Sequence, residues 1–422
     1  MVGADAMRVM VIGGGIGGLT TALRLHAAGI AVRVYESARE IRALGVGINL
    51  LPHAVRELTA LGLLDALLAA GVPTGELRYF SKSGQQIWQE PRGLAAGYQW
   101  PQISIHRGAL QMLLRDAAAA QLGTEQIRTG HHLAAFTQRG DGTVEARFVD
   151  RRSGAPVATE TADLLIGADG IHSAVRRALY ADEGLPQWNG AILWRAITPS
   201  APFLTGRSMF MAGHARQKFV AYPITTTADE HGRVPINWIA ELRFDTTALA
   251  DREDWNRRGN LADFLPAFAG WRFDWLDIPD LIRRAEVVYE YPMVDRDPLD
   301  TWSVGRVTLL GDAAHPMYPV GSNGASQAIL DARALADALA ANADIPAALR
   351  DYEAHRRPAT ARITLSNRQQ GPERVMQIVE ERAPQGFTDL DAVISHTELA
   401  AIAAEYKQIA GFDRETLNRQ TV

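Results

Sequence analysis

The sequence of 422 residues contains no cysteine. This absence excludes disulfides, thiolate-bound metals, thiol nucleophiles and a cysteinyl link to a cofactor. Redox chemistry in this protein would therefore need a bound cofactor. No apolar run approaches the roughly 20 residues of a membrane span, and the first residues lack the basic start and small-residue cleavage site of a signal peptide. Together these absences predict a cytoplasmic protein without a membrane span.

A strong positive charge is also missing. The formal net charge is −5 and the pI about 6.1, so no field draws the chain to nucleic acid or to anionic lipid. His131 and His132 are adjacent in a strand-like run and should face opposite ways, and no other grouping suggests a metal site. We therefore predict small-molecule partners and no metal.

Hydrophobic residues make up 47% of the sequence, enough to bury cores in roughly two or three domains. Residues 8–12 form an apolar run, a glycine cluster and a helical pattern follow, and residues 32–35 are strand-like again. This order predicts a βαβ unit. Similar runs at 163–166 and 307–310 are typical of parallel strands covered on both faces. All of these strands are predicted to lie in one interrupted sheet.

The middle of the sequence has a different pattern. Residues 191–197, 218–224 and 236–242 are strand-like and rich in aromatic residues, with polar turns between them. This spacing predicts an antiparallel sheet that belongs to a second domain. A helix is predicted at 325–341, and helical patterns continue after Pro358.

A glycine motif follows the first predicted strand. It reads Gly13-Gly14-Gly15-Ile16-Gly17-Gly18, and Glu36 closes the next strand. Glycines permit a tight turn and let a pyrophosphate approach backbone N–H groups, while the carboxylate accepts from ribose hydroxyls. In this βαβ setting the motif predicts a dinucleotide site, without deciding between FAD and NAD.

Two later loops also follow predicted strands. One contains Asp169-Gly170, with Ser173 as the expected N-cap of a helix. The other contains Gly311-Asp312, and a helix is expected to begin near Gly324. Loops at the carboxyl ends of strands are where α/β sheets bind ligands. The free N–H groups at the start of the second helix would stabilise negative charge.

These three motifs, in this order and at these separations, resemble the class A FAD-dependent aromatic hydroxylases. The resemblance covers at least residues 7–365, and the stretches Ser104-Ile-His-Arg107 and Tyr291-Pro-Met-Val-Asp-Arg-Asp-Pro298 also fit it. Within that family, Leu44-Gly-Val-Gly-Ile-Asn49 looks like the phenazine hydroxylases that form pyocyanin from 5-methylphenazine-1-carboxylate.

The resemblance implies a fold and a domain plan. The fold is α/β, with a Rossmann-like FAD-binding domain of the interrupted GR2 type, an antiparallel-sheet substrate domain and a C-terminal helical segment. We expect the FAD-binding domain at 1–76, 101–182 and 286–365, the substrate domain at 77–100 and 183–285, and the helical segment at 366–422.

The resemblance also assigns cofactor contacts. The expected FAD-binding residues are Gly13, Gly15 and Gly18 at the pyrophosphate, Glu36 at the adenosine ribose, Arg107 at the pyrophosphate and ribityl region, and Asp312 at the ribityl chain. Asp169 is linked to both FAD and NAD(P)H. Asn323 and Gly324 are expected at the pyrimidine edge of the flavin, Gly47 on its other side, and Leu133 beside the cofactor.

The substrate pocket is expected between the flavin and the second sheet. Candidate wall residues are Trp194, Arg195, Met209, Met211 and Trp238, although any of them could equally be sheet core.

Two residues are expected to act on the substrate. Tyr222 is the preferred polar contact, because a phenol can bond a substrate oxygen while its ring packs on the substrate. Pro319 should pack near the reactive edge of the flavin. A substrate carboxylate would need a partner, for which Arg195 and His106 are the candidates.

The implied reaction uses NADH or NADPH to reduce FAD, adds O₂ as a C4a-hydroperoxyflavin and hydroxylates an aromatic, phenazine-like ring, with or without decarboxylation. A hydroxybenzoate- or salicylate-type hydroxylase is one alternative. A flavin oxidase, dehydrogenase or halogenase on the same fold is another, and a non-catalytic flavin-fold binding protein is a third. Intact Glu36, Arg107 and Asp312 argue against the third. Both a monomer and a homodimer remain open.

Overall fold

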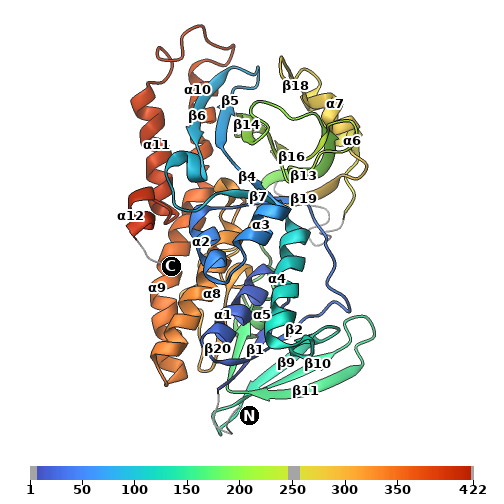
Figure 1. Ribbon diagram of the computed structural model, residues 1–422, viewed down its shortest axis with the longest axis vertical. Helices are drawn as coiled ribbons and strands as arrows, with labels where there is room; N and C mark the ends of the chain where they lie inside the picture. The colour runs from blue at the N-terminus through green and yellow to red at the C-terminus, as the bar shows by residue number, and fades with distance from the viewer. Residues whose placement is uncertain (1–6, 246–256, 420–422) are drawn as a thin grey trace.

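The computed structural model describes residues 7–245 and 257–419. They form an α/β protein that is elongated along one axis, with a parallel sheet and its helices in the lower half of Figure 1 and a larger sheet in the upper half. Helices α9 (Ile345–Arg368) and α11 (His396–Ile409) run along one side of the molecule.

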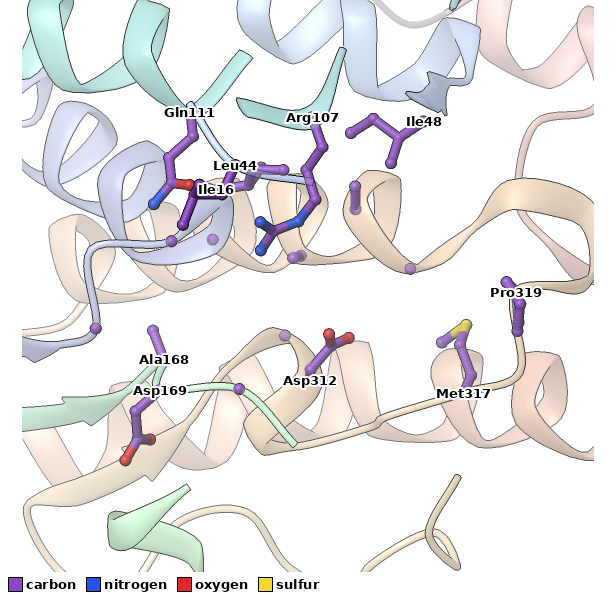
Figure 2. A pocket seen from close by; sticks show the side chains of 18 of the residues that line it. Ile16, Leu44, Ile48, Arg107, Gln111, Ala168, Asp169, Asp312, Met317 and Pro319 are labelled. Atoms are coloured by element: carbon purple, nitrogen blue, oxygen red, sulfur yellow. The ribbon is translucent and has the colours of Figure 1, made fainter. Parts of the chain in front are cut away.

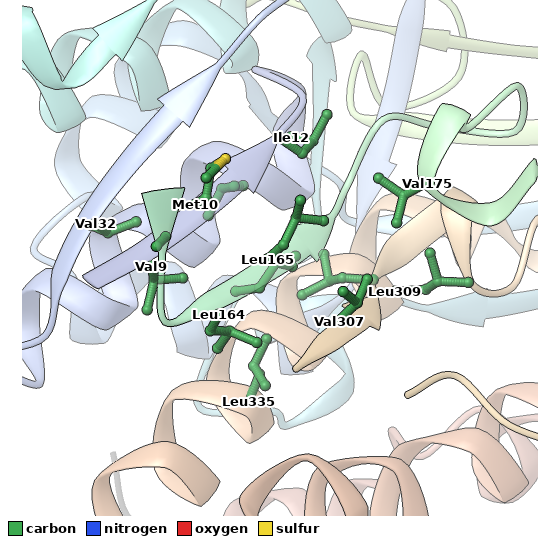
Figure 3. Packing of buried hydrophobic residues seen from close by; sticks show 14 of the residues in the cluster. Val9, Met10, Ile12, Val32, Leu164, Leu165, Val175, Val307, Leu309 and Leu335 are labelled. Carbon is green, nitrogen blue, oxygen red and sulfur yellow. The ribbon is translucent and has the colours of Figure 1, made fainter. Parts of the chain in front are cut away.

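The parallel sheet has the strand order β20-β12-β1-β2-β8, and every neighbouring pair is parallel. Its strands are β1 (Arg8–Ile12), β2 (Ala31–Tyr35), β8 (Ile127–Arg128), β12 (Leu164–Gly167) and β20 (Val307–Leu309). Helices α1 (Ile16–Ala27), α4 (Arg107–Leu122) and α8 (Gly324–Ala341) complete this half. The strand side chains are buried in one core with α8 (Figure 3) because helices cover the sheet.

The larger sheet has the order β19-β13-β16-β15-β14-β5-β6. Its strands are β5 (Glu76–Phe80), β6 (Gln86–Pro91), β13 (Gln187–Ser200), β14 (Ser208–His214), β15 (Gln217–Pro223), β16 (Val234–Arg243) and β19 (Tyr289–Asp295). The β14–β5 pair is parallel and the other pairs are antiparallel. One face packs on α6 (Leu261–Phe264) and α7 (Ile278–Arg283), and part of the other face packs on α10 (Arg374–Arg382).

Smaller elements complete the two halves. They are the strands β3 (Gly47–Leu50), β4 (Val72–Pro73), β7 (Ile103–His106), β9 (His132–Gln138), β10 (Val144–Val149), β11 (Pro156–Ala162), β17 (Arg272–Phe273) and β18 (Leu276–Asp277), and the helices α2 (Pro52–Ala60), α3 (Leu64–Ala70), α5 (Ala174–Leu179) and α12 (Arg414–Arg419). Strands β9 to β11 form an antiparallel sheet that the sequence analysis does not predict.

The predicted fold class is confirmed, with an interrupted parallel sheet, a second, mainly antiparallel sheet and C-terminal helices. One expected boundary needs correction. Strand β19 lies in the range assigned to the FAD-binding domain, yet it pairs with β13 of the larger sheet. A strand belongs to the sheet of its hydrogen-bonding partner, and the sequence does not show that partner.

Candidate functional site

A cavity of about 650 Å³ lies between the carboxyl ends of the parallel strands and one face of the larger sheet. Figure 2 shows lining side chains on two opposite sides of the cavity. Arg107 and Gln111 approach from one side, and Asp169, Asp312 and Met317 lie on the other. The cavity thus collects segments that are far apart in the sequence.

The glycine turn between β1 and α1 forms one wall. Gly13 has a φ of +110°, and a Cβ there would lie 2.4 Å from the Ala168 carbonyl oxygen. A Cβ on Gly18 would lie 2.0 Å from the Gly13 oxygen. In contrast, a Cβ on Gly15 would meet no atom within 4 Å. Gly13 and Gly18 are therefore needed for the fold itself, whereas Gly15 faces open space at the start of α1.

Glu36 closes β2 and lines the same wall. Its carboxylate accepts from the Gly14 N–H at 2.8 Å and from the Ala38 N–H at 2.7 Å. Gln111, one helical turn after Arg107, donates to the Gly14 carbonyl at 2.8 Å. These bonds hold the glycine turn in place from two sides.

Arg107 and Asp312 face the cavity from opposite sides (Figure 2). Arg107 begins α4, and Asp312 lies in a short 3-10 turn after β20. The Asp312 side chain is exposed to the cavity, and the protein around the cavity raises the pKa of its carboxyl group by desolvation, while His315 and Arg107 oppose the shift. Asp331 supports the turn by accepting from the Gly311 N–H at 3.1 Å.

Asp169 also lines the cavity, but its carboxylate has structural partners. It accepts from the Ser173 hydroxyl and from the Ala174 N–H, the latter at 2.7 Å. Ser173 caps α5 by accepting from the Arg176 N–H, which confirms the predicted N-cap. The Asp169-Gly170 loop is therefore fixed by the helix that follows it.

The face of the larger sheet supplies the opposite wall. Arg195 donates through Nη2 to the Gly47 carbonyl at 2.8 Å, and the Asn237 side chain accepts from the Gly47 N–H at 2.7 Å. Arg195 also hydrogen-bonds with Tyr222, whose pKa burial raises to about 12. Tyr222 is consequently a neutral phenol at physiological pH. Met209, Met211 and Val220 form the apolar part of this wall.

The Arg195 guanidinium has no carboxylate partner among the described residues. Its Nε is buried and makes no hydrogen bond. Burial lowers the pKa of this group, but an arginine remains charged in proteins. The wall therefore presents an uncompensated positive charge to the cavity.

Trp194 and Trp238, expected as pocket walls, are placed elsewhere. Neither lines the cavity; both pack in the core on the far face of the sheet, where Trp194 stacks on Phe264 with ring centroids 4.7 Å apart. Adjacent residues of a strand point to opposite faces, so Trp194 and Arg195 cannot share a wall. The expectation for the two tryptophans is corrected to sheet core.

His106 was expected as a possible partner of a substrate carboxylate, and the structure places it elsewhere. Its Nδ1 accepts from the Ala109 N–H at 3.3 Å, so the ring caps α4, and it does not line the cavity. His131 and His132 both line the cavity, because His131 precedes the start of β9 and the strand alternation does not apply to it.

The structure brings most of the expected residues to this one cavity. The lining includes Gly13, Gly15, Glu36, Gly47, Arg107, Leu133, Asp169, Arg195, Met209, Met211, Tyr222, Asp312, Pro319, Asn323 and Gly324, while Gly18 lies behind the turn.

The polar lining residues that were not expected from the sequence include Gln111, Lys218, Glu241 and Glu373. The helical spacing of Gln111 from Arg107 could have identified it. Lys218 and Glu241 lie on the same sheet face as Tyr222, but no motif marks them.

Within residues 7–245 and 257–419, no group of three His, Asp or Glu side chains could hold a metal ion. No helix in the same ranges is long and apolar enough to cross a membrane.

Comparison with known families matches residues 6–260 and 285–366 to the family described as FAD binding domain. A phenazine 1,6-dicarboxylic acid hydroxylase of Lysobacter antibioticus is 47% identical over 413 residues, 97% of this chain and 98% of the relative. A 3-hydroxybenzoate 6-hydroxylase of Klebsiella oxytoca is 31% identical over 381 residues, covering 87% and 89%.

Solved structures share the fold. A salicylate hydroxylase in complex with its substrate has a TM-score of 0.75 at 24% identity and covers 99% of this chain and 98% of its own. HpxO of Klebsiella pneumoniae with FAD and uric acid has a TM-score of 0.72 at 24% identity, with coverage of 98% and 95%.

Proposed function

The chain belongs to the FAD-binding-domain family of class A aromatic hydroxylases and is an FAD-dependent monooxygenase, and from this premise we propose that it hydroxylates a carboxylated, phenazine-like ring with electrons from NADH or NADPH. The observation that carries the proposal is the unpaired Arg195 beside Tyr222 in the cavity wall. The relative of Lysobacter antibioticus, named for a phenazine dicarboxylic acid, supports the same ring class.

The residues present fit FAD. Gly15 leaves open space at the start of α1, where free N–H groups and the helix dipole favour a pyrophosphate. Arg107 and Asp312 face the space between them from opposite walls, as hydrogen-bonding groups for a phosphate and a polyol chain would. When bound, FAD supplies electrons drawn from NAD(P)H and the C4a position at which O₂ is activated for oxygen transfer.

Arg195 is proposed to bind the substrate carboxylate. A guanidinium and a carboxylate form strong, charge-assisted hydrogen bonds. The Arg195 side chain lines the cavity and has no carboxylate partner among the described residues, so its charge is open to such a pairing, and the enclosing wall reduces competition from water.

Tyr222 is proposed to orient the ring. Its phenol oxygen can accept from Arg195, which leaves the phenol proton for a substrate oxygen. Because its pKa is about 12, Tyr222 stays a donor throughout the neutral range. Met209, Met211 and Val220 surround this group with apolar surface, which would exclude water from the reacting atoms.

Glycine 15 provides a test of the proposed cofactor contact. In Gly15→Ala, the added methyl group would enter empty space in the protein but would obstruct a pyrophosphate at the helix start. We expect the unfolding temperature of the apoprotein to stay unchanged and the FAD dissociation constant, measured by fluorescence titration, to rise roughly tenfold.

The matched variant is Gly18→Ala, whose methyl group collides with the Gly13 oxygen. It should lower the stability of the apoprotein by about 1–3 kcal/mol or more. Equal FAD affinity in Gly15→Ala and the wild type would show that the turn does not hold the pyrophosphate.

A hydroxybenzoate- or salicylate-type reaction is the second candidate. The 3-hydroxybenzoate 6-hydroxylase relative favours it, because a single carboxylated ring could also reach Arg195.

A product-identified screen distinguishes the two candidates. Phenazine carboxylates, hydroxybenzoates and salicylate are each incubated in air with the FAD-loaded protein and NADH or NADPH, and products, CO₂ and peroxide are measured. We expect hydroxylated phenazine as the main product. Hydroxylation confined to single-ring substrates would reject the phenazine proposal and support the second candidate.

A further inference from the structure

The C-terminal segment after residue 366 lies outside the family match, which ends there. It nevertheless contacts the loop of residues 318–323, which precedes α8 and lines the cavity through Pro319 and Asn323. The Asn367 side chain donates to the Tyr318 carbonyl at 3.0 Å. The segment therefore reaches the wall where the flavin ring is expected.

The loop has a backbone conformation that needs support. Gly321 has a φ of +68° and Ser322 a φ of +60°. A non-glycine residue in the left-handed region is strained and persists only when its surroundings hold it there. The contacts of this loop must therefore come from elsewhere in the fold.

Tyr406, in α11, supplies such contacts. It is 4% exposed, and its hydroxyl accepts from the Asn323 side-chain amide at 2.8 Å. The same hydroxyl lies 3.1 Å from the Val320 carbonyl and 3.0 Å from the Asn367 side-chain oxygen, so its proton can serve either acceptor.

The close approach of Tyr406 also explains why a glycine occupies position 321. A Cβ at that position would lie 2.0 Å from the Tyr406 hydroxyl oxygen. The loop and the tyrosine are thus fitted to each other.

A second contact from the same segment reaches the loop. Glu373 accepts from the Gly321 N–H and pairs with Lys218 of β15. Lys218 also pairs with Glu241 of β16 at 2.8 Å. These buried charges connect the loop, the C-terminal segment and the substrate-side sheet.

We propose that Tyr406 is a positioning residue: its hydroxyl holds the 318–323 loop, and Asn323 in particular, in the geometry that contacts the flavin ring. The inference depends on the proposed function only for the placement of the flavin beside this loop. It makes the C-terminal segment part of the active site. It predicts that loss of one hydroxyl group, more than 80 residues away in the sequence from Asn323, changes the flavin environment.

The test compares Tyr406→Phe with Tyr98→Phe. Tyr98 is also buried, and its hydroxyl donates to the carbonyl of Phe412 in the same C-terminal segment at 2.7 Å, but it does not contact the loop. Each variant therefore loses one buried tyrosine hydroxyl that contacts this segment. Three quantities are measured: the FAD dissociation constant of the apoprotein, the midpoint potential of the bound flavin, and the fraction of NAD(P)H that ends as peroxide.

For Tyr406→Phe we expect an FAD dissociation constant about tenfold higher, as for loss of one buried hydrogen bond. We also expect a more negative flavin potential and a larger peroxide fraction. In Tyr98→Phe all three should stay within about twofold of the wild type. Equal values in the two variants would reduce Tyr406 to a structural role and overturn the proposal.

A second variant covers the case in which Tyr406→Phe does not fold. Asn367→Ala keeps the tyrosine but removes both an acceptor of its hydroxyl and the bond of the same segment to the Tyr318 carbonyl, and it should shift the same three quantities in the same direction. Unchanged values would also overturn the proposal. A wild type that binds FAD but hydroxylates no aromatic compound would contradict the proposed function, while the affinity and potential comparisons would still decide the role of Tyr406.

Discussion

Asp312→Ala is expected to purify largely colourless, with an FAD dissociation constant roughly 100-fold above that of the wild type. The carboxylate is exposed to the cavity just after the end of β20, and the surrounding protein raises its pKa by desolvation. A hydrogen bond to a charged group in such surroundings contributes more than one in water, so its loss is costly. Flavin content is read from the ratio of absorbance at the flavin band to that at the protein band.

The control for Asp312→Ala is Asp337→Ala. Asp337 lies on α8, is largely exposed and pairs with Arg333 at 2.5 Å, and exposed pairs contribute little to stability. This variant should keep its full flavin content. If Asp312→Ala also kept its flavin, the role assigned to the carboxylate would be wrong.

Arg195→Met is expected to lower kcat/KM for a carboxylated substrate about 100-fold, mostly through KM. Methionine keeps much of the side-chain volume and removes the charge, so the proposed partner of the substrate carboxylate is lost. Because Arg195 also holds the Gly47 carbonyl, the FAD dissociation constant is measured in parallel. Lysine at this position should restore part of the loss, since it keeps the charge but not the planar guanidinium.

A substrate analogue without the carboxylate provides the decisive comparison for Arg195. With this analogue, Arg195→Met should lower kcat/KM by less than about fivefold. The analogue has no carboxylate to pair with Arg195, so the substitution has no such interaction to remove. The control variant is Arg216→Met. Arg216 lies between β14 and β15, is exposed and pairs with Asp245 at 2.6 Å. A similar loss for both substrates would show that Arg195 does not recognise the carboxylate.

The part of the cavity that we propose holds FAD could be predicted from the sequence, because its residues lie beside local motifs. Gly13, Glu36 and Asp312 each lie at or just after the carboxyl end of a parallel strand, and such ends meet at one edge of a sheet. Strand periodicity and glycine spacing therefore suffice to gather them. The structure places all three in one cavity.

The part of the cavity that we propose binds the substrate was less predictable from the sequence. Strand alternation requires Trp194 and Arg195 to face opposite ways, but the sequence does not say which face is the cavity. The answer depends on α6 and α7, which cover the tryptophan side.

The contact of Tyr406 with Asn323 was not predictable either. It joins two segments 83 positions apart, and no local pattern marks a pair at that separation.

The measurement that tests the central claim most directly is oxygen-isotope labelling. The FAD-loaded protein is supplied with NADH or NADPH and a phenazine carboxylate under ¹⁸O₂, and the product is examined by mass spectrometry. A flavin monooxygenase should place a single labelled oxygen on the ring while consuming NAD(P)H in about equal amount to the product. An unlabelled ring, with all NAD(P)H converted to peroxide for every aromatic compound tried, would contradict the account.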